Sequence, residues 1–362
     1  MKTILRTFVG CTAILFGTAC MGAVKYVPEN MKVELSLKVP GNNAVNYKLH
    51  PDKLENSYFD YEWRSDNKLP ITVFHKVEER DSCMRLTVQL TAAQDVYFNY
   101  RQLLSTGYRH DNCQFYMPGF WYRRNLRSPK KAPSFHTSDS WLVREDRLSA
   151  PLTGIFSEKE KRFMTVNRLD DFSMDALATH KEGEIILSGK TSLGFTGFEN
   201  QQGIAMLSFG FPYREAPKSY IRKLTLAPEV EAFQLMKKGE SVLLTWEIME
   251  SGADDFSDFI QHTWEHCYDT YAPKPVENSY SIADMKQVLS CFFVNSLVDN
   301  QPLVYNSGIH LKVSDCERNG QAEVGFIGRV LLNAFNAWEY GWQSNREELK
   351  VNSTKTVSYT HL

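Results

Sequence analysis

The chain has 362 residues, of which 43% are hydrophobic and 23% are charged, and its formal net charge at pH 7 is -2. This is the composition of a globular protein, and a charge so close to zero gives no field that would attract nucleic acid or an anionic membrane surface. Nucleic acid is therefore excluded as an expected partner.

The first 22 residues have the order of features that is typical of a secretory signal peptide. Lys2 and Arg6 precede an apolar run over 8–16, and small residues follow at 17–19. A run of this length is too short to span a bilayer. We therefore expect an exported protein of the periplasm or cell surface. Cys20, directly after the small residues, is a candidate for lipid attachment to the outer membrane.

The region from 27 to 250 consists of short runs in which apolar and polar residues alternate. The clearest runs cover 33–39, 71–74, 84–90, 184–188, 204–209, 221–226 and 242–248. A period of two residues is typical of strands, and Gly, Pro and Asn between the runs indicate turns. Many short strands with few helical stretches predict one large antiparallel β-sandwich domain over 27–250.

The apolar period changes to about 3.6 residues at Asp254, which predicts helices. A linker helix is expected within 254–275, ending before Pro273, with one apolar arc formed by Phe256, Phe259, Ile260, Thr263, Trp264, Cys267 and Tyr271. A second helix should begin at Ser281 as N-cap, with Asp284 at its third position. A third, over 324–340, is apolar nearly all round and is expected to be buried on most sides.

The segment from His262 to His266 matches the H-x-x-E-H pattern of inverted zinc metallopeptidases. On a helix, both histidines fall away from the apolar arc that faces the core. We interpret the segment as a solvated helix face and predict neither a metal site nor a cofactor.

The cysteines give no evidence of a metal site or a disulfide framework. Five remain after the signal, an odd and widely spaced set: Cys83, Cys113, Cys267, Cys291 and Cys316. At most one bridge is expected. No C-x-x-C pair is present, so a zinc ribbon or a thioredoxin-like redox site is not predicted.

Three stretches resemble a known group of proteins. They are Pro118-Gly119-Phe120-Trp121-Tyr122, the run Ser140-Trp141-Leu142-Val143-Arg144-Glu145-Asp146-Arg147, and the helical string over 325–337. Together with the order of sandwich, linker helix and paired helices, they resemble six-hairpin glycosidase-like proteins of polysaccharide degradation in gut Bacteroidetes. The resemblance implies a β-sandwich followed by an (α/α)6 toroid. Far fewer residues follow Pro275 than six helical hairpins require, so we expect an incomplete toroid over 276–352 and interpret 353–362 as a non-native tail.

A glycosidase needs two carboxyl groups that flank the scissile bond. The resemblance implies that such groups lie before the inner helices of the toroid, where this chain carries Asp315, Glu317 and Glu323. These three are the catalytic candidates. The alternative is that Glu323 is an acid favoured at a helix N-terminus and that the other two are solvated loop charges.

The sandwich loops contain aromatic and arginine side chains in segments with little alternation. Sugars stack on flat aromatic rings, and the planar guanidinium binds a carboxylate or sulfate through two hydrogen bonds. The substrate-binding candidates are Tyr108, Arg109, Trp121, Tyr122, Arg123, Arg124, Trp141 and Arg144. The alternative is that the aromatic rings fill the core and that the arginines pair with neighbouring acids at the surface.

The resemblance, together with the signal-like start, thus implies the N-terminal part of an exported glycoside hydrolase that acts on a complex or acidic polysaccharide or oligosaccharide. Two alternatives stay open. One is a non-catalytic glycan-binding or structural sandwich protein. The other is a polysaccharide lyase, which would use Tyr, His and Arg to remove a proton beside a uronate.

Overall fold

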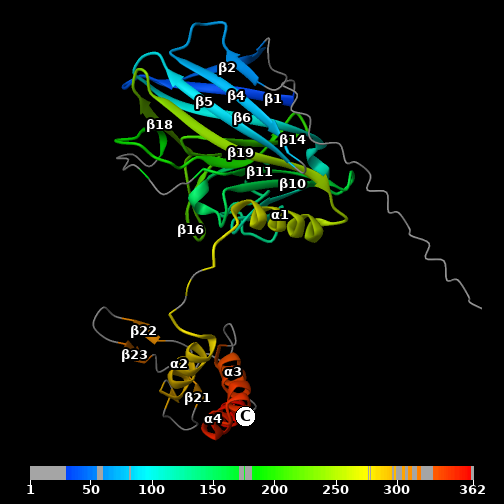
Figure 1. Cartoon of the computed structure of the whole chain (residues 1–362), viewed down its shortest axis with the longest axis vertical. Helices are drawn as coiled ribbons and strands as arrows, with labels where there is room; N and C mark the ends of the chain where they lie inside the picture. The colour runs from blue at the N-terminus through cyan, green and yellow to red at the C-terminus, as the bar shows by residue number, and fades with distance from the viewer. Residues whose placement is uncertain are drawn as a thin grey trace, which may run out of the picture. The chain divides into compact units, whose positions relative to one another are not determined.

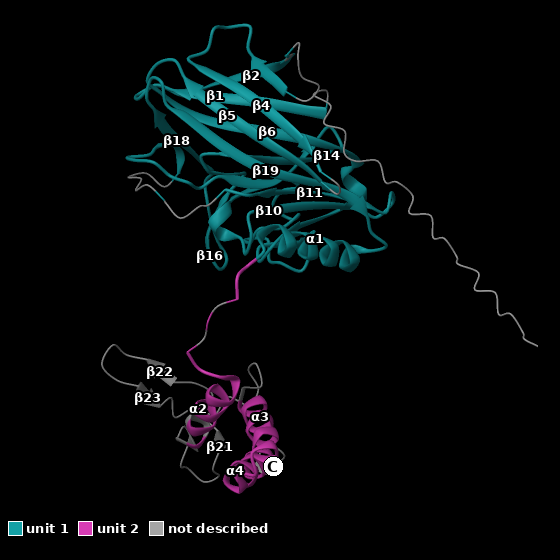
Figure 2. Cartoon of the chain, in the orientation of Figure 1, with its two compact units in different colours: residues 1–272 teal, residues 273–362 magenta. Residues whose placement is uncertain are grey.

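The computed structural model of the chain describes residues 30–54, 60–80, 83–170, 175, 182–275, 277, 279–295, 297–298, 304–305, 309–311, 316–318 and 329–359. The chain divides into two compact units, 1–272 and 273–362 (Figure 2). The predicted signal peptide and Cys20 lie outside the described residues. The predicted fold class is confirmed in its order: a large antiparallel β body precedes a unit that contains helices.

The first unit is built on two antiparallel sheets (Figure 1). One sheet has the order β2 (Val45–Lys53), β1 (Met31–Lys38), β6 (Val96–Arg109), β14 (Ile204–Phe211), β13 (Phe195–Gln201) and β9 (Trp141–Arg144). The other has the order β2, β3 (Asp60–Arg64), β4 (Ile71–Glu79), β5 (Cys83–Ala92), β19 (Ser241–Gly252), β11 (Arg162–Arg168), β10 (Leu152–Ser157), β7 (Cys113–Met117) and β8 (Trp121–Arg123).

The long strand β2 joins the two sheets. Its first half pairs with β1, from Val45 to Leu49, and its second half pairs with β3, from His50 to Lys53. Smaller strands complete the unit: β18 (Val230–Met236) pairs with β6 and also with β12 (Gly183–Ile186) and β15 (Arg214–Glu215), while β16 (Ser219–Arg222) pairs with β17 (Thr225–Ala227).

The alternation seen in the sequence places one side chain of every two in the core. In β5, Met84, Leu86, Val88 and Leu90 are buried, whereas Arg85 and Gln89 between them are not. The core between the sheets is strongly aromatic, with Tyr100, Phe115, Trp121, Trp141, Phe198 and Trp246 almost completely enclosed. Most of the aromatic side chains of the sandwich therefore serve packing.

One ion pair is enclosed within the sandwich. Arg168 donates to Glu145 at 2.6 Å, and their side chains are only 3% and 0% exposed. Glu145 also accepts the backbone N–H of Gly194 at 2.7 Å. A Cβ at Gly194 would lie 2.4 Å from the carbonyl oxygen of Gly210, so the close approach requires glycine here. Burial raises the pKa of Glu145, against the opposing effect of Arg168.

Helix α1 (Phe256–Tyr271) lies on the outer side of the second sheet (Figure 1). Asp255 caps its N-terminus by accepting the N–H groups of Ser257 and Asp258 at 2.7 and 3.0 Å. Phe259 and Cys267 pack against Phe156, Phe163 and Met249 of the sheet. The apolar arc is confirmed for Phe256, Phe259, Thr263 and Cys267, which are buried.

The second unit contains α2 (Ile282–Asn295), α3 (Arg329–Gln343) and α4 (Glu347–Tyr359). Two short pairs accompany them, β20 (Leu297–Val298) with β21 (Val304–Tyr305) and β22 (Ile309–Leu311) with β23 (Cys316–Arg318). The predicted cap of α2 is present: the Asp284 N–H donates to the Ser281 hydroxyl at 3.1 Å, and the Ser281 N–H donates to the Asp284 carboxylate at 3.0 Å. Helix α4 continues to Tyr359, into the segment interpreted as a tail.

The expectation that the third helix is buried on most sides is wrong for α3. Val330, Ala334 and Ala337 are buried, whereas Leu332, Phe335 and Trp342 are exposed. Helix α4 packs Leu349 against Ala334 and Ala337 and places Lys350 over the ring of Trp342, which leaves large apolar side chains of α3 exposed. No described helix is long and apolar enough to cross a membrane.

Candidate functional site

The hairpin β7–β8 forms the base of a hollow on the sandwich surface. Phe115 pairs with Arg123, and Met117 pairs with Trp121, in antiparallel register. The turn contains Gly119 with φ of +80°, where a Cβ would also meet the Ser149 hydroxyl oxygen at 2.8 Å. Only glycine fits this turn without strain.

Trp121 anchors the end of β8. Its ring is completely buried, and its Nε1 donates to the backbone carbonyl of Arg123 at 2.9 Å. Arg123 has φ of +57°, a left-handed conformation that is uncommon for a residue with a side chain. The buried tryptophan thus holds the backbone of an exposed arginine in an unusual conformation.

Asn125 closes the loop that follows. Its Oδ1 accepts the N–H of Tyr122 at 3.0 Å, and its Nδ2 donates to the carbonyls of Phe120 and Pro133 at 3.2 and 3.1 Å. Its φ of +49° is one that asparagine tolerates better than most residues. The loop is therefore fixed by one side chain at three points.

The hollow enclosed by this hairpin and loop has a volume of about 670 Å³. Three arginines and one exposed aromatic ring take part, and no aspartate or glutamate lines it. The lining residues are Gln114, Tyr122, Arg123, Arg124, Asn125, Leu126, Arg127 and Ser128. The surface of the hollow is therefore polar and positively charged.

Among the described residues, no acid lies within ion-pair distance of Arg123, Arg124 or Arg127. Arg124 instead donates to the backbone carbonyls of Cys113 and His110, at 3.2 and 3.4 Å, and lies over the ring of Phe135 at 5.1 Å. Hydrogen bonds to neutral carbonyls orient the guanidinium but leave its charge in place.

Arg123 stands over the ring of Phe256, with its guanidinium carbon 5.0 Å from the ring centroid. It is also a minor cause of the lowered pKa of Asp255, which comes mainly from the backbone N–H groups of Asp258 and Ser257. The cation–π contact positions the guanidinium without removing its charge.

Tyr122 supplies the aromatic surface of the hollow. Its side chain is 53% exposed, and its ring lies edge-on against buried Tyr116 with centroids 5.3 Å apart. Tyr122, Arg123 and Arg124 are the predicted binding residues that the structure brings together.

The prediction that Trp121 and Trp141 bind sugar is wrong. Both side chains are 0% exposed, and their ring centroids lie 6.0 Å apart within the core. They occupy inward-facing positions of β8 and β9, and Trp121 packs edge-on against Phe198. A ring enclosed on both faces cannot stack on a sugar.

The other three predicted residues do not line the hollow. Tyr108 is buried, and its hydroxyl donates to the Glu250 carboxylate at 3.1 Å. Arg144 donates to Asp146 at 3.0 and 2.8 Å and to Asp175 at 3.0 Å, so its charge is already paired and the predicted role is not supported. Arg109 is exposed, and its nearest carboxylate partner, Asp111, lies 3.9 Å away.

The predicted catalytic acids cannot be placed in a site. Asp315 and Glu323 lie outside the described residues. The backbone of Glu317 lies in β23, opposite His310, and its side chain is not described. Their catalytic role stays a prediction.

The interpretation of the H-x-x-E-H segment is wrong for one of its two histidines. His262 is exposed and lies 3.5 Å from Asp258 of its own helix. His266, in contrast, faces the sheet, with its Nε2 2.8 Å from Oε2 of Glu247 in β19. Because α1 packs closely against the sheet, the side chain of Glu247 reaches His266 at the edge of the apolar arc.

Glu247 also lies beside Cys83. Burial acts to raise the pKa of Glu247, but hydrogen bonds from His266, Thr270 and Cys83 outweigh it and lower this pKa to about 2. Burial, reinforced by the Glu247 carboxylate, raises the pKa of the Cys83 thiol to about 12. Cys83 is therefore protonated and is not an activated nucleophile.

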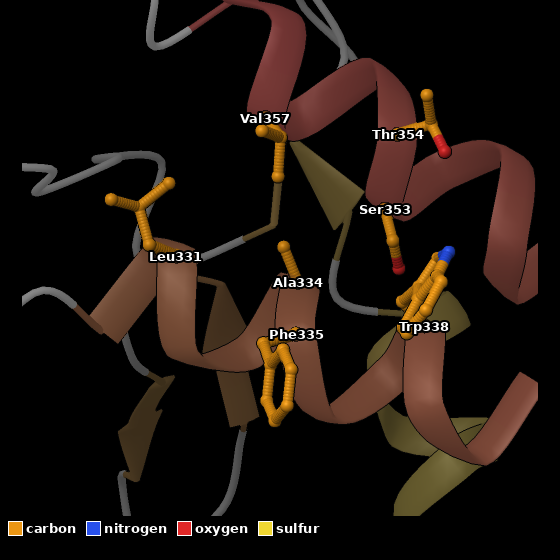
Figure 3. A pocket seen from close by; sticks show the side chains of 7 residues that line it. All are labelled: Leu331, Ala334, Phe335, Trp338, Ser353, Thr354 and Val357. Carbon is orange, nitrogen blue, oxygen red and sulfur yellow. The ribbon is translucent and has the colours of Figure 1, made fainter.

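A second hollow, of about 310 Å³, lies between α3 and α4 (Figure 3). It is lined mainly by apolar side chains, among them Phe335, Trp338 and Val357, and by no charged residue. It lacks the groups that recognise a charged or strongly polar ligand.

The eight predicted binding residues leave out part of the first hollow. Arg127 belongs to the run Arg123-Arg124-Asn125-Leu126-Arg127, and this density of arginine was a usable signal. Gln114 and Ser128 gave no signal, because they reach the hollow only through the hairpin and loop geometry.

No protein-family model matches the chain, and no curated protein matches its sequence. Three solved structures resemble parts of the fold at TM-scores of 0.32, 0.32 and 0.27: a polysaccharide lyase, a protein of Synechocystis sp. PCC 6803 and a protein assigned as a kojibiose phosphorylase from the human microbiome. Their identities to this chain are 12%, 8% and 6%, over 65%, 60% and 74% of its length. The chain spans 27%, 73% and 28% of those structures, so it corresponds to about a quarter of the lyase and of the phosphorylase. Similarity at this level assigns no family.

Proposed function

We propose that the hollow at β7–β8 binds an anionic saccharide, with a uronate carboxylate or a sulfate as the recognised group. The observation that carries this proposal is the presence of three arginines around one hollow, with no acidic residue in the lining. Such a surface attracts an anion, because no carboxylate in the lining competes with the anion for the arginines.

The geometry favours a sugar over a simple inorganic anion. The volume of about 670 Å³ lies within the range of small-molecule sites, about 300–1,000 Å³. The exposed ring of Tyr122 offers an apolar face, and Asn125, Gln114 and Ser128 offer polar atoms at the same wall. Sugars present both kinds of surface, apolar C–H faces and hydroxyl groups.

The hollow is suited to binding and not to hydrolysis. Glycoside hydrolysis uses two carboxyl groups, about 5 to 9.5 Å apart, and the lining of the hollow has none. We propose that the sandwich is the glycan-binding part of an exported glycoside hydrolase. Export is supported by the signal-like first 22 residues, and hydrolysis by the sequence resemblance with its acids Asp315, Glu317 and Glu323.

The test is calorimetric titration of a short oligouronate into the wild-type chain and single arginine variants. Arg123→Gln and Arg127→Gln should each weaken binding about fivefold, since an exposed charge pair contributes up to ~1 kcal/mol. Arg109→Gln is the matched control, because Arg109 is an exposed arginine outside the hollow. Equal affinity in all four proteins, or a loss confined to the control, would refute the proposal.

A further inference from the structure

Three side chains that bind metals well converge under helix α1. Cys83 begins β5, Glu247 lies in β19 and His266 lies in α1. The strand register pairs Cys83 with Met249 and Arg85 with Glu247, so these four side chains share the sheet face that α1 covers. The thiol sulfur, a carboxylate oxygen and an imidazole nitrogen all lie within 4.8 Å of one another.

We propose that Cys83, Glu247 and His266 form a zinc site, with its fourth coordination position open to water. Thiolate, imidazole and carboxylate are the three ligand types that zinc takes in proteins, and three protein ligands with one open position is a recurring zinc arrangement. Sites for magnesium or calcium would instead use oxygen ligands alone.

The present distances are close to those of a tetrahedral site. Zinc lies about 2.0–2.2 Å from nitrogen and oxygen and about 2.3 Å from sulfur, so neighbouring ligand atoms in a tetrahedron stand about 3.4 to 3.6 Å apart. The Nε2 of His266 and Oε2 of Glu247 are 2.8 Å apart and need to separate slightly. The Cys83 thiol already hydrogen-bonds to the Glu247 carboxylate, and its sulfur lies within 4.8 Å of the His266 nitrogen. Rotamer adjustments supply movements of this size.

Neighbouring groups already orient the proposed ligands. The hydroxyl of Thr270 donates to Oε2 of Glu247 at 3.0 Å, and Arg85 donates to Oε1 at 3.3 Å. Hydrogen bonds of this kind fix carboxylate ligands and are part of most metal sites. The positive charge of Arg85 also offsets part of the negative charge of the thiolate and the carboxylate.

The framework around the three residues is rigid. Two strands in fixed register carry Cys83 and Glu247, and Phe259 and Cys267 pack the helix that carries His266 against the sheet. The side chains of Glu247 and His266 are 4% and 18% exposed, so the site is shielded but can be reached from solvent. On binding, the sulfur–zinc bond replaces the S–H bond and the proton passes to water. The ion would then connect α1 to the sandwich.

The test uses the full chain without an affinity tag, after chelation and dialysis, titrated with Co²⁺ and then with Zn²⁺. The wild type should bind about one ion per chain, and the cobalt form should show a thiolate-to-metal charge-transfer band that zinc abolishes. Cys83→Ser and His266→Gln should weaken zinc binding by more than ~100-fold, because loss of a direct ligand costs more than loss of an orienting group.

Two matched variants are the controls. His262→Gln removes the exposed histidine one turn earlier on the same helix, and Cys291→Ser removes an exposed thiol in the second unit. Both should keep wild-type stoichiometry and the charge-transfer band. Thr270→Val, which retains all three ligands, should weaken binding about tenfold.

The proposal is overturned if the wild type shows no charge-transfer band, or if Cys83→Ser and His266→Gln bind zinc as tightly as the controls. Should either ligand variant fail to fold, the band in the wild type and its persistence in Cys291→Ser decide the question. This result is independent of saccharide binding.

Discussion

The ring of Tyr122 lies edge-on against the ring of Tyr116, at an interplanar angle of 64°. Tyr116 is buried, and its hydroxyl accepts a hydrogen bond from Nε1 of Trp264 in α1 at 2.8 Å. The exposed ring at the hollow is thus supported from beneath by the sheet and the helix. A ring held in this way loses little conformational freedom when a ligand stacks on it.

Truncation of Tyr122 should weaken saccharide binding without unfolding the protein. Tyr122→Ala removes the stacking surface and should lower affinity for a saccharide about three- to tenfold, corresponding to the ~0.5–1.5 kcal/mol of an aromatic contact. Tyr122→Phe keeps the ring and should bind within about twofold of the wild type. Titration calorimetry measures both, and equal affinity of Tyr122→Ala and the wild type would show that the ring takes no part.

Substitution of Trp121 should mainly lower the free energy of unfolding. Trp121→Ala leaves a cavity in the core and should reduce the free energy of unfolding by about 3–5 kcal/mol. Trp121→Phe retains most of the packing but loses the hydrogen bond to the carbonyl of Arg123. It should cost about 1–2 kcal/mol. Urea unfolding monitors both variants, and a stability change below ~1 kcal/mol for Trp121→Ala would contradict its place in the core.

Removal of one partner of the buried ion pair should strongly destabilise the fold. Arg168→Met leaves the Glu145 carboxylate enclosed without its cation, and the free energy of unfolding should fall by about 3–5 kcal/mol. The control is Arg64→Met, which removes an exposed partner of Asp52 and Glu62 and should change stability by less than ~1 kcal/mol. The midpoints of urea unfolding, measured at pH 7, compare the two. Similar losses in both variants would be inconsistent with the burial of the pair.

His75 should make the fold sensitive to mildly acidic pH. Its side chain is fully buried beside Tyr100, with Nε2 2.8 Å from the phenol oxygen, and burial lowers its pKa from 6.5 to about 3. Between these values the unfolded chain binds the proton and the folded chain does not. Stability should therefore decrease as pH falls below 6.5, by up to ~1.4 kcal/mol per pH unit.

The variant His75→Gln isolates this effect. It removes one of two buried histidines in the described part of the chain whose pKa burial lowers, the other being His110, so its unfolding free energy should change less than that of the wild type between pH 6.5 and 5. Glu247, whose pKa falls from 4.5 to about 2 on folding, adds stability that is lost only below pH 4.5, outside this window. A slope in His75→Gln as steep as in the wild type would rule out this histidine as the source.

The sequence predicted the sandwich because strand alternation is a local signal. The run from Met84 to Leu90 alternates in the sequence and in burial. Likewise, the cap of α2 is formed by Ser281 and Asp284, which are only three positions apart in the sequence. The surface of α3 could not be predicted in the same way, because it depends on which other helices cover it.

Candidate binding residues were harder to separate from the core. Trp121 and Tyr122 are neighbours in one strand, and composition treats them alike, yet alternation directs one ring inward and the other outward. Cys83, Glu247 and His266 are distant in sequence and meet only through the register of β5 with β19 and the packing of α1. No spacing rule within the sequence could have joined them.

Recognition of an anionic saccharide by the hollow can be measured with a matched pair of ligands. An oligouronate and the neutral oligosaccharide of the same sugars and length are titrated into the wild-type chain at low salt and at about 1 M salt, where the Debye length falls to about 3 Å. We predict that the oligouronate binds more tightly at low salt and that high salt removes most of this preference. Equal affinity for the two ligands at low salt, or a preference that salt does not reduce, would contradict this prediction.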